Sequence, residues 1–155
     1  MHVEYINPFL NATKNVIETM ANVKISNEKP GLKKGNLSWG CVSGVIGMAS
    51  DKLKGHMVIS FDEPCILGIV TGMLGEPFTQ MNQDVVDAVG EITNMICGGA
   101  KKELNEMGYK FDLAIPLMIV GKNIEITQLT KGPVLTIPFA TAAGKFVVEA
   151  NLVER

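Results

Sequence analysis

The amino-acid sequence predicts an α+β fold in which two long helices pack on one face of a mainly antiparallel sheet. Two segments, 7–23 and 82–107, carry apolar residues at helical spacing. Short stretches rich in β-branched and aromatic residues follow both of them and are separated by Gly, Asn and Pro turns. No linker or low-complexity stretch divides the chain, so we expect residues 1–155 to form one domain.

The first half of the chain is expected to place a short helix after two strands. Its elements in order are a helix at 7–23, strands at 37–48 and 56–61, and a helix from Pro64 to Gly75. Asp62 is a good N-cap for the short helix, because its carboxylate can accept a hydrogen bond from a free N–H of the first turn. Pro64 fits that turn, where no backbone donor is needed.

The second half is expected to open with the longest helix, which starts at Asn82 or Asp84 and ends near Met107, with Gly108 as its stop. Four β-rich stretches follow, at 111–120, 124–129, 134–140 and 145–153. Aligning the two long helices superposes apolar positions, Phe9 with Val89, Ala12 with Ile92 and Val16 with Ile96. Any two amphipathic helices can be phased in this way, so the residues alone leave an internal duplication open.

The composition argues against nucleic acid and membranes as partners. Sixteen acidic and fourteen basic residues give a net charge of −2, which supplies no electrostatic footprint for nucleic acid. The richest apolar run, 65–74, has about half of the ~20 residues that a bilayer span requires. The N-terminus lacks the basic and apolar regions of a secretory signal, so we expect a cytoplasmic protein. The mean hydropathy of +0.21 favours a well-filled core and a subunit interface.

The cysteines and histidines give little support for a metal site or a covalent mechanism. Cys41, Cys65 and Cys97 are odd in number and widely spaced, which fits buried reduced thiols better than a disulfide framework. With His2 and His56 as the only histidines, few ligands exist for zinc. A catalytic Cys–His pair is formally possible, but we expect neither a cofactor nor a metal held by this chain.

The long helix carries a polar stripe opposite its apolar side. At 100° per residue, Asp84, Asp87, Glu91, Asn94, Gly98 and Asn105 fall opposite Val85, Val89, Ile92, Ile96, Ala100 and Met107. Glu91 and Asn94 are three residues apart and can act on one target. A carboxylate can hold a cation, and a carboxamide can orient a water because it offers a donor and an acceptor. An amphipathic helix must show polar residues to water in any case, so the pair alone is weak evidence.

Three glycines stand inside this helix, Gly90, Gly98 and Gly99. Each costs about 1 kcal/mol of helix stability relative to alanine. Such residues suggest that another backbone comes close, either the underlying sheet or a docking partner.

The segment 87–94, Asp-Ala-Val-Gly-Glu-Ile-Thr-Asn, followed by Pro116, resembles the signature of the CheC/CheX/FliY phosphatases. That signature has Asp or Ser, three residues, Glu, two residues and Asn, with a Pro farther along. The likeness covers essentially the whole chain. It implies a CheC-like, internally duplicated fold and a phosphatase acting on the aspartyl-phosphate of a CheY-like response regulator in chemotaxis or a related two-component pathway.

The resemblance assigns catalysis to Glu91 and Asn94. Asn94 would hydrogen-bond the attacking water, and Glu91 would pair with a lysine beside the regulator's phosphate. The regulator would carry the Mg²⁺. Asp87 could extend the contact, although balancing charge near the helix N-terminus is the simpler role. Pro116 is expected to be structural.

On the first helix, the positions aligned with Glu91 and Asn94 are Asn11 and Lys14, so no catalytic role is carried onto it. One intact site resembles CheX more than two-site CheC.

The family likeness also implies a homodimer joined through its sheets. The strand with Trp39, Cys41 and Val45 is a candidate for the joining edge. Two other functions stay open: a non-catalytic adaptor that binds a response regulator on the same fold, and a plain oligomeric ligand-binding domain. The intact carboxylate–carboxamide pair argues against the adaptor, and the lack of a further convergent polar cluster argues against the ligand-binding domain.

Overall fold

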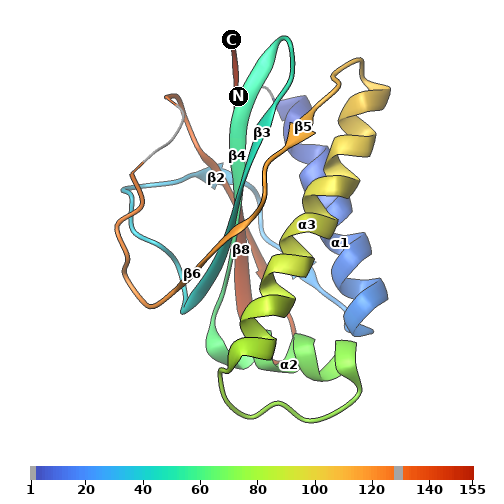
Figure 1. Cartoon of the computed structure of the whole chain (residues 1–155), viewed down its shortest axis with the longest axis vertical. Coiled ribbons are helices and arrows are strands. Elements are labelled where there is room, and N and C mark those ends of the chain that lie inside the picture. Colours follow the sequence, from blue (N-terminus) through green and yellow to red (C-terminus); the bar gives the residue numbers. More distant parts are fainter. Residues whose placement is uncertain (1–2, 128–130) are drawn as a thin grey trace.

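A computed structural model describes residues 3–127 and 131–155. One antiparallel sheet carries the two long helices, α1 and α3, side by side on one face, with the shorter α2 at one end (Figure 1). The elements are η1 (Val3–Tyr5), α1 (Ile6–Ala21), β1 (Ser26–Asn27), β2 (Gly31–Leu32), β3 (Val42–Ala49), β4 (Leu53–Phe61), α2 (Glu63–Leu74), α3 (Gln83–Glu106), β5 (Asp112–Leu113), β6 (Leu117–Val120), β7 (Leu135–Ala140) and β8 (Lys145–Glu154). The α+β class is confirmed, and so is the placement of both long helices on one face.

Helix boundaries follow the local signals that the sequence offers. The Asp62 carboxylate accepts a hydrogen bond from the Cys65 N–H at 2.8 Å and caps α2. Gly75, with a left-handed φ of 72°, follows Leu74 and stops the helix. The Asn82 side chain accepts from the Val85 N–H at 3.0 Å and caps α3. Both capping bonds lie within the first turn of their helix, and the second Asp62 oxygen also accepts from the Lys145 N–H at 2.9 Å.

The strand order reveals two repeats that exchange their first strands. Across the sheet the order is β1-β7-β8-β4-β3-β5, with β2 also on β7 and β6 also on β3. In each half, a long helix precedes two short strands and two long ones. The last strands of the halves, β4 and β8, pair at the centre, while the short strands of each half pair with the other half's outer strand. The duplication that the sequence left open is therefore visible in the topology.

Both edges of the sheet carry the same irregularity. The segment 113–117 takes four steps while its partner segment, 45–48, takes three. The segment 27–31 does the same against 136–139. An extra residue opposite a shorter partner segment is a β-bulge. Proline is tolerated there because it has no backbone N–H, and a bulged residue does not need to donate one to the neighbouring strand. The prolines that end the two bulges are Pro30 and Pro116.

Small residues let α3 lie close to its neighbours. The fully buried Thr93 side chain fills the space where a Cβ on Gly44 of β3 would stand. Where α3 meets α1, a Cβ on Gly99 would lie 3.0 Å from the Ala12 Cβ. The close neighbour at Gly99 is therefore helix α1 and not the sheet or a docking partner, which were the two neighbours that the sequence suggested, and a Cβ on Gly98 would meet nothing within 4 Å in the described chain.

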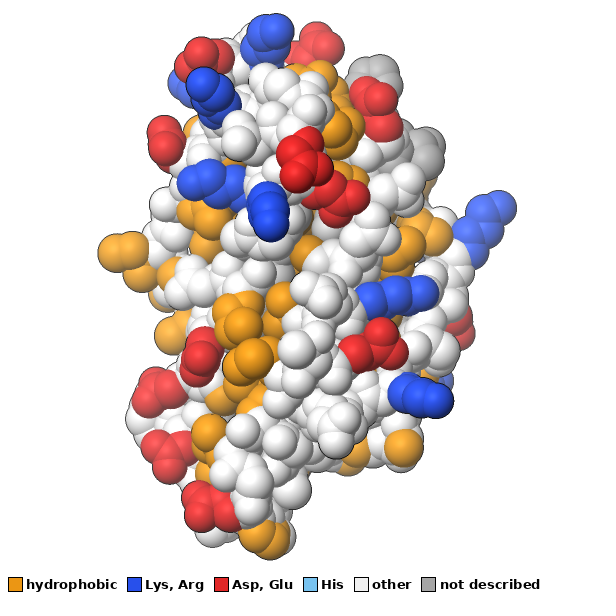
Figure 2. Space-filling model, turned by 90° about the vertical axis from the view of Figure 1, so that its right-hand side faces the viewer, with side chains coloured by type: hydrophobic (Ala, Val, Ile, Leu, Met, Phe, Trp, Pro, Cys, Tyr) orange, Lys and Arg blue, Asp and Glu red, His pale blue; other side chains and the backbone are white. Residues whose placement is uncertain are grey.

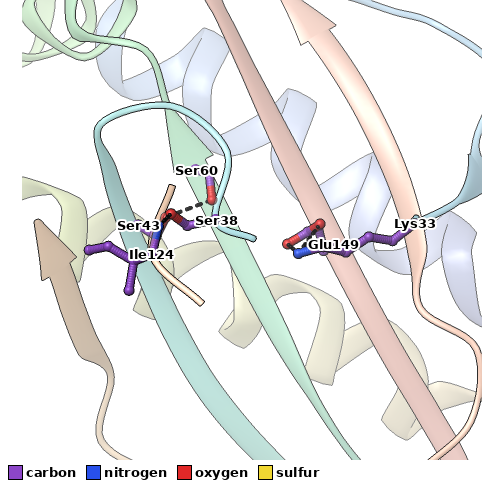
Figure 3. Close-up of polar contacts among 6 residues, drawn as sticks. All are labelled: Lys33, Ser38, Ser43, Ser60, Ile124 and Glu149. Atoms are coloured by element: carbon purple, nitrogen blue, oxygen red, sulfur yellow. Dashed lines mark hydrogen bonds and ion pairs between the residues drawn. The ribbon is translucent and has the colours of Figure 1, made fainter. Parts of the chain in front are cut away.

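The connections 33–41 and 121–127 cover part of the other face of the sheet (Figure 1). They bond to each other: the Ser38 N–H donates to the Ile124 carbonyl at 2.7 Å, and the Ile124 N–H donates to Ser38 Oγ at 2.9 Å (Figure 3). Beside them, Lys33 Nζ lies 3.0 and 2.9 Å from the two carboxylate oxygens of the buried Glu149 (Figure 3).

This covering corrects two expected strands. The strand predicted at 37–48 begins only at Val42, because Leu37 and Ser38 pair with the second connection rather than with the sheet. The stretch 124–127 forms an isolated bridge, Leu37 with Glu125, and no strand, while Leu129 lies outside the described residues.

The expected joining edge is also wrong. Val45 belongs to β3, which is flanked by β4 on one side and by β5 and β6 on the other. Trp39 and Cys41 precede that strand. Alternation of apolar residues gives a strand its two faces but not its place in the sheet, and the strands at the edges are the short ones.

Candidate functional site

Helix α3 is held in place by its buried inner side. It runs for 24 residues, and the predicted apolar side is buried at Val85, Val89, Ile92, Ile96 and Ala100. Met107, predicted on the same side, follows the last helical residue and is 40% exposed. Because the inner side is packed on the sheet and on α1, the backbone holds the Cα atoms of the outer residues in fixed relative positions.

The predicted stripe faces away from the core. Asp84, Asp87, Glu91, Asn94 and Asn105 are exposed, and Gly98 is half-buried. Glu91 and Asn94 lie about one helical turn apart. Neither side chain makes a hydrogen bond or ion pair with any described residue. Both polar groups are therefore free to meet a partner.

Two other residues singled out from the sequence are engaged within the chain. Asp87 accepts a hydrogen bond from Gln83 Nε2 at 2.8 Å, one turn back on the same helix. Asn11, which aligns with Glu91, donates to Glu103 Oε1 at 2.9 Å and so ties α1 to α3. Lys14 is half-buried on α1. The Asn11 side chain is thus hydrogen-bonded within the chain, whereas that of Glu91, the residue aligned with it, is bonded to no described residue.

Strand β6 reaches α3 at the turn that carries the pair. A Cβ on Gly90 would lie 3.0 Å from Met118 Sδ, so the missing side chain lets Met118 pack beside the residue that precedes Glu91. Pro116 stands directly before β6, at the end of the bulge. The sequence analysis did not predict the bulge or the contact of Met118. Pro116 was a possible signal, because a proline inside a β-rich stretch is typical of a bulge.

Other reactive groups lie elsewhere and are held unreactive. Burial raises the pKa of the Cys65 and Cys97 thiols to about 12, and burial with nearby acidic groups also raises the pKa of the half-buried Cys41. A thiol must ionise to act as a nucleophile, so none of these is activated. His56 is buried on β4 at the face opposite the helices, and His2 lies outside the described residues.

Neither a metal centre nor a membrane span emerges from the part of the chain that the structure describes. Within residues 3–127 and 131–155, no three His, Cys, Asp or Glu side chains are grouped to hold an ion. Over the same residues, no helix is both long and apolar enough to cross a bilayer.

A family model described as "Chemotaxis phosphatase CheX" matches residues 42–140, which is more than half of the chain and includes the pair and Pro116. The chain belongs to the CheX family. The matched region spans both halves of the fold and contains all of α3.

Solved structures extend this CheX likeness over the full length. A CheC-like superfamily protein from Shewanella sp. PV-4 is 44% identical, with a TM-score of 0.91 and 99% of each chain covered. A chain in the CheX–CheY–BeF3–Mg²⁺ complex from Borrelia burgdorferi is 29% identical, with a TM-score of 0.80 and 99% of each chain covered. The CheY-P phosphatase CheX of Thermotoga maritima is 27% identical over 97 residues, 62% of this chain and 61% of that protein. The match thus spans less than two thirds of that relative.

Proposed function

We propose that this protein removes the phosphoryl group from the aspartyl-phosphate of a CheY-like response regulator and so terminates a chemotaxis or related two-component signal. The observation that carries the proposal is the Glu91–Asn94 pair, exposed and unengaged on a helix whose other side is buried. The partner is supported by the name of the Thermotoga maritima relative and by the CheX–CheY complex from Borrelia burgdorferi.

Asn94 orients the attacking water in this proposal. An aspartyl-phosphate is an activated acyl phosphate, so its hydrolysis needs mainly a water in line with the breaking P–O bond. The Asn94 carboxamide can hold that water through its donor and acceptor groups without a change of charge. The water oxygen then bonds to phosphorus, the carboxylate of the regulator leaves, and inorganic phosphate carries the water's protons.

Glu91 fixes the docking geometry. Its carboxylate lies one turn from Asn94, so it can pair with a lysine beside the regulator's phosphate while Asn94 meets the water. The regulator carries the Mg²⁺ that offsets the phosphoryl charge, as the metal in the Borrelia burgdorferi complex suggests. Asp87 is already hydrogen-bonded to Gln83, and we assign it to charge balance near the N-terminus of α3.

Acyl-phosphate decay of a purified CheY-like regulator tests this function. Asn94→Ala should slow the accelerated decay about 100-fold or more, because it removes a group that acts in the transition state. Its binding to a BeF3-loaded regulator should largely persist. Glu91→Ala should weaken both binding and rate. Since both side chains are exposed, neither change should lower the free energy of unfolding by more than about 0.5 kcal/mol.

The matched controls are Asn11→Ala and Lys14→Ala on α1, which should leave the phosphatase rate nearly intact. Full activity in Asn94→Ala would place the site elsewhere. Binding of the regulator by the wild-type protein without faster decay would favour the non-catalytic adaptor.

We further propose that residues 1–155 act as one phosphatase domain and that the protein works in the cytoplasm as a homodimer. Large apolar side chains exposed on the surface support an association between copies. Light scattering at micromolar protein should show the dimer, and a monomer there would count against it.

A further inference from the structure

Ile115 stands almost fully in solvent next to the candidate site. Its side chain is 90% exposed, the highest value among the exposed large hydrophobic residues in the described parts of the chain. It lies in the bulge before β6, the strand that packs against α3 at Gly90. An isolated apolar side chain at a surface is ordinary, but one close to the Glu91–Asn94 pair suggests that a partner covers it.

The bulge holds Ile115 in a fixed place. The Ala114 N–H donates to the Gly47 carbonyl at 3.0 Å, and the ladder resumes where Leu117 pairs with Val45. Pro116 restricts the backbone between these two anchor points. A segment held this way loses little backbone freedom when a partner covers it.

The register places this region on the helix side of the sheet. The bulge stands opposite Ile46, a core residue on the face covered by the helices. Met118 and Val120 share that face, because they pair with Gly44 and Val42, whereas Leu117 pairs with Val45 and points to the other face.

We name as the apolar border Ile115 in the bulge together with Met118 and the 57%-exposed Val120 on β6, the strand that packs against α3. Figure 2 looks onto the face of the molecule that carries α1 and α3.

The two repeats supply an internal comparison. In the first half, the equivalent bulge ends in Pro30, and the residue before it is the exposed Lys29. That half carries Asn11 and Lys14 where the second half has the intact pair. The same backbone feature thus presents isoleucine beside the intact pair and lysine in the half that lacks it.

We propose that the apolar border is a second contact for the response regulator, which packs an apolar surface next to its phosphorylated aspartate against Ile115 while the polar pair enters its active site. This proposal rests on the proposed function and adds a determinant of affinity to it. The border determines the affinity for the regulator, and Asn94 acts in the hydrolysis step.

Calorimetric binding of a purified CheY-like regulator, loaded with BeF3 and Mg²⁺, to Ile115→Asp and Ile115→Ser tests the proposal. Charging an interface anchor should raise the Kd at least tenfold, and serine should raise it by a smaller factor. With phosphorylated regulator, KM should rise while kcat at saturation changes little. Because Ile115 is exposed, both variants should keep the wild-type unfolding transition.

Two matched controls are available in the same chain. Leu117→Asp changes a 64%-exposed residue two positions away on the other face, and Lys29→Asp changes the equivalent bulge. Both should bind the regulator with the wild-type Kd.

Unchanged regulator binding in Ile115→Asp would overturn the proposal. So would loss of the homodimer in light scattering with unchanged regulator binding, which would assign the border to a second copy of this chain. If the wild-type protein neither binds the regulator nor speeds its dephosphorylation, the proposed function itself fails, and the border's role fails with it.

Discussion

Replacing Gly44 of β3 by alanine should disturb the contact between β3 and α3. The new Cβ would collide with Thr93 Oγ1 and would lie 3.0 and 3.2 Å from the Thr93 Cβ and Cγ2. Thr93 is fully buried and already donates its hydroxyl to the Val89 carbonyl at 2.7 Å, so rotating it away would break that bond. Overpacking of this kind costs about 1–3 kcal/mol. For a chain of this size we expect Tm to fall by about 2–4 °C per kcal/mol.

The same change should lower phosphatase activity, because Thr93 stands between Glu91 and Asn94 and any shift of the helix moves both. Urea unfolding and acyl-phosphate decay measure the two effects. Thr93→Ala removes the colliding atoms, so the double variant should be less destabilised than the sum of the single ones, with a coupling of about 1 kcal/mol or more. Strict additivity would refute the claim that α3 rests on β3 through this contact.

Two further outcomes follow from the described contacts. Gly98→Ala adds a methyl group that meets nothing within 4 Å, so it should stabilise α3 by up to about 1 kcal/mol and raise Tm; a fall in Tm would show that the position is crowded. Burial and the charge of Lys33 lower the pKa of His56 in the folded protein, so the folded state takes up a proton less readily than the unfolded chain. The free energy of unfolding should therefore fall as pH drops below about 6.5, the ordinary histidine pKa, and His56→Gln should flatten that fall in urea unfolding between pH 7.5 and 5.5. An unchanged slope in His56→Gln would assign the acid sensitivity to other groups.

Features decided within a few residues could be predicted from the sequence. The caps at Asp62 and Asn82 bond to N–H groups three residues ahead, so neighbouring residues alone locate them. The exposure of the Glu91–Asn94 pair follows from the helical period once the buried side is recognised. The catalytic assignment came from the family resemblance, because an exposed carboxylate and carboxamide suit many helix surfaces.

Features decided by distant partners could not be predicted. Ser38 lies in a β-like stretch, yet its backbone partner is Ile124, 86 residues farther along the chain. The stretch 111–120 alternates as one strand would, and the extra residue shows only when its register is compared with 45–48. Pro116 marks a place where a bulge could stand, but the exposure of Ile115 inside it is seen only in the structure.

The exchange of short strands makes the half without the Glu–Asn pair a necessary part of the fold. The first half supplies β3, the floor beneath α3, and Asn11, which holds α3 through Glu103. Its outer strand, β3, pairs with β5 and β6 of the second half. Its own short strands, β1 and β2, pair with β7 of the second half. The outer strand of each half is thus paired on its outer side by short strands of the other half. The first helix has Asn11 and Lys14 in place of the Glu–Asn pair but still packs against α3, so natural variation along it should be limited by packing.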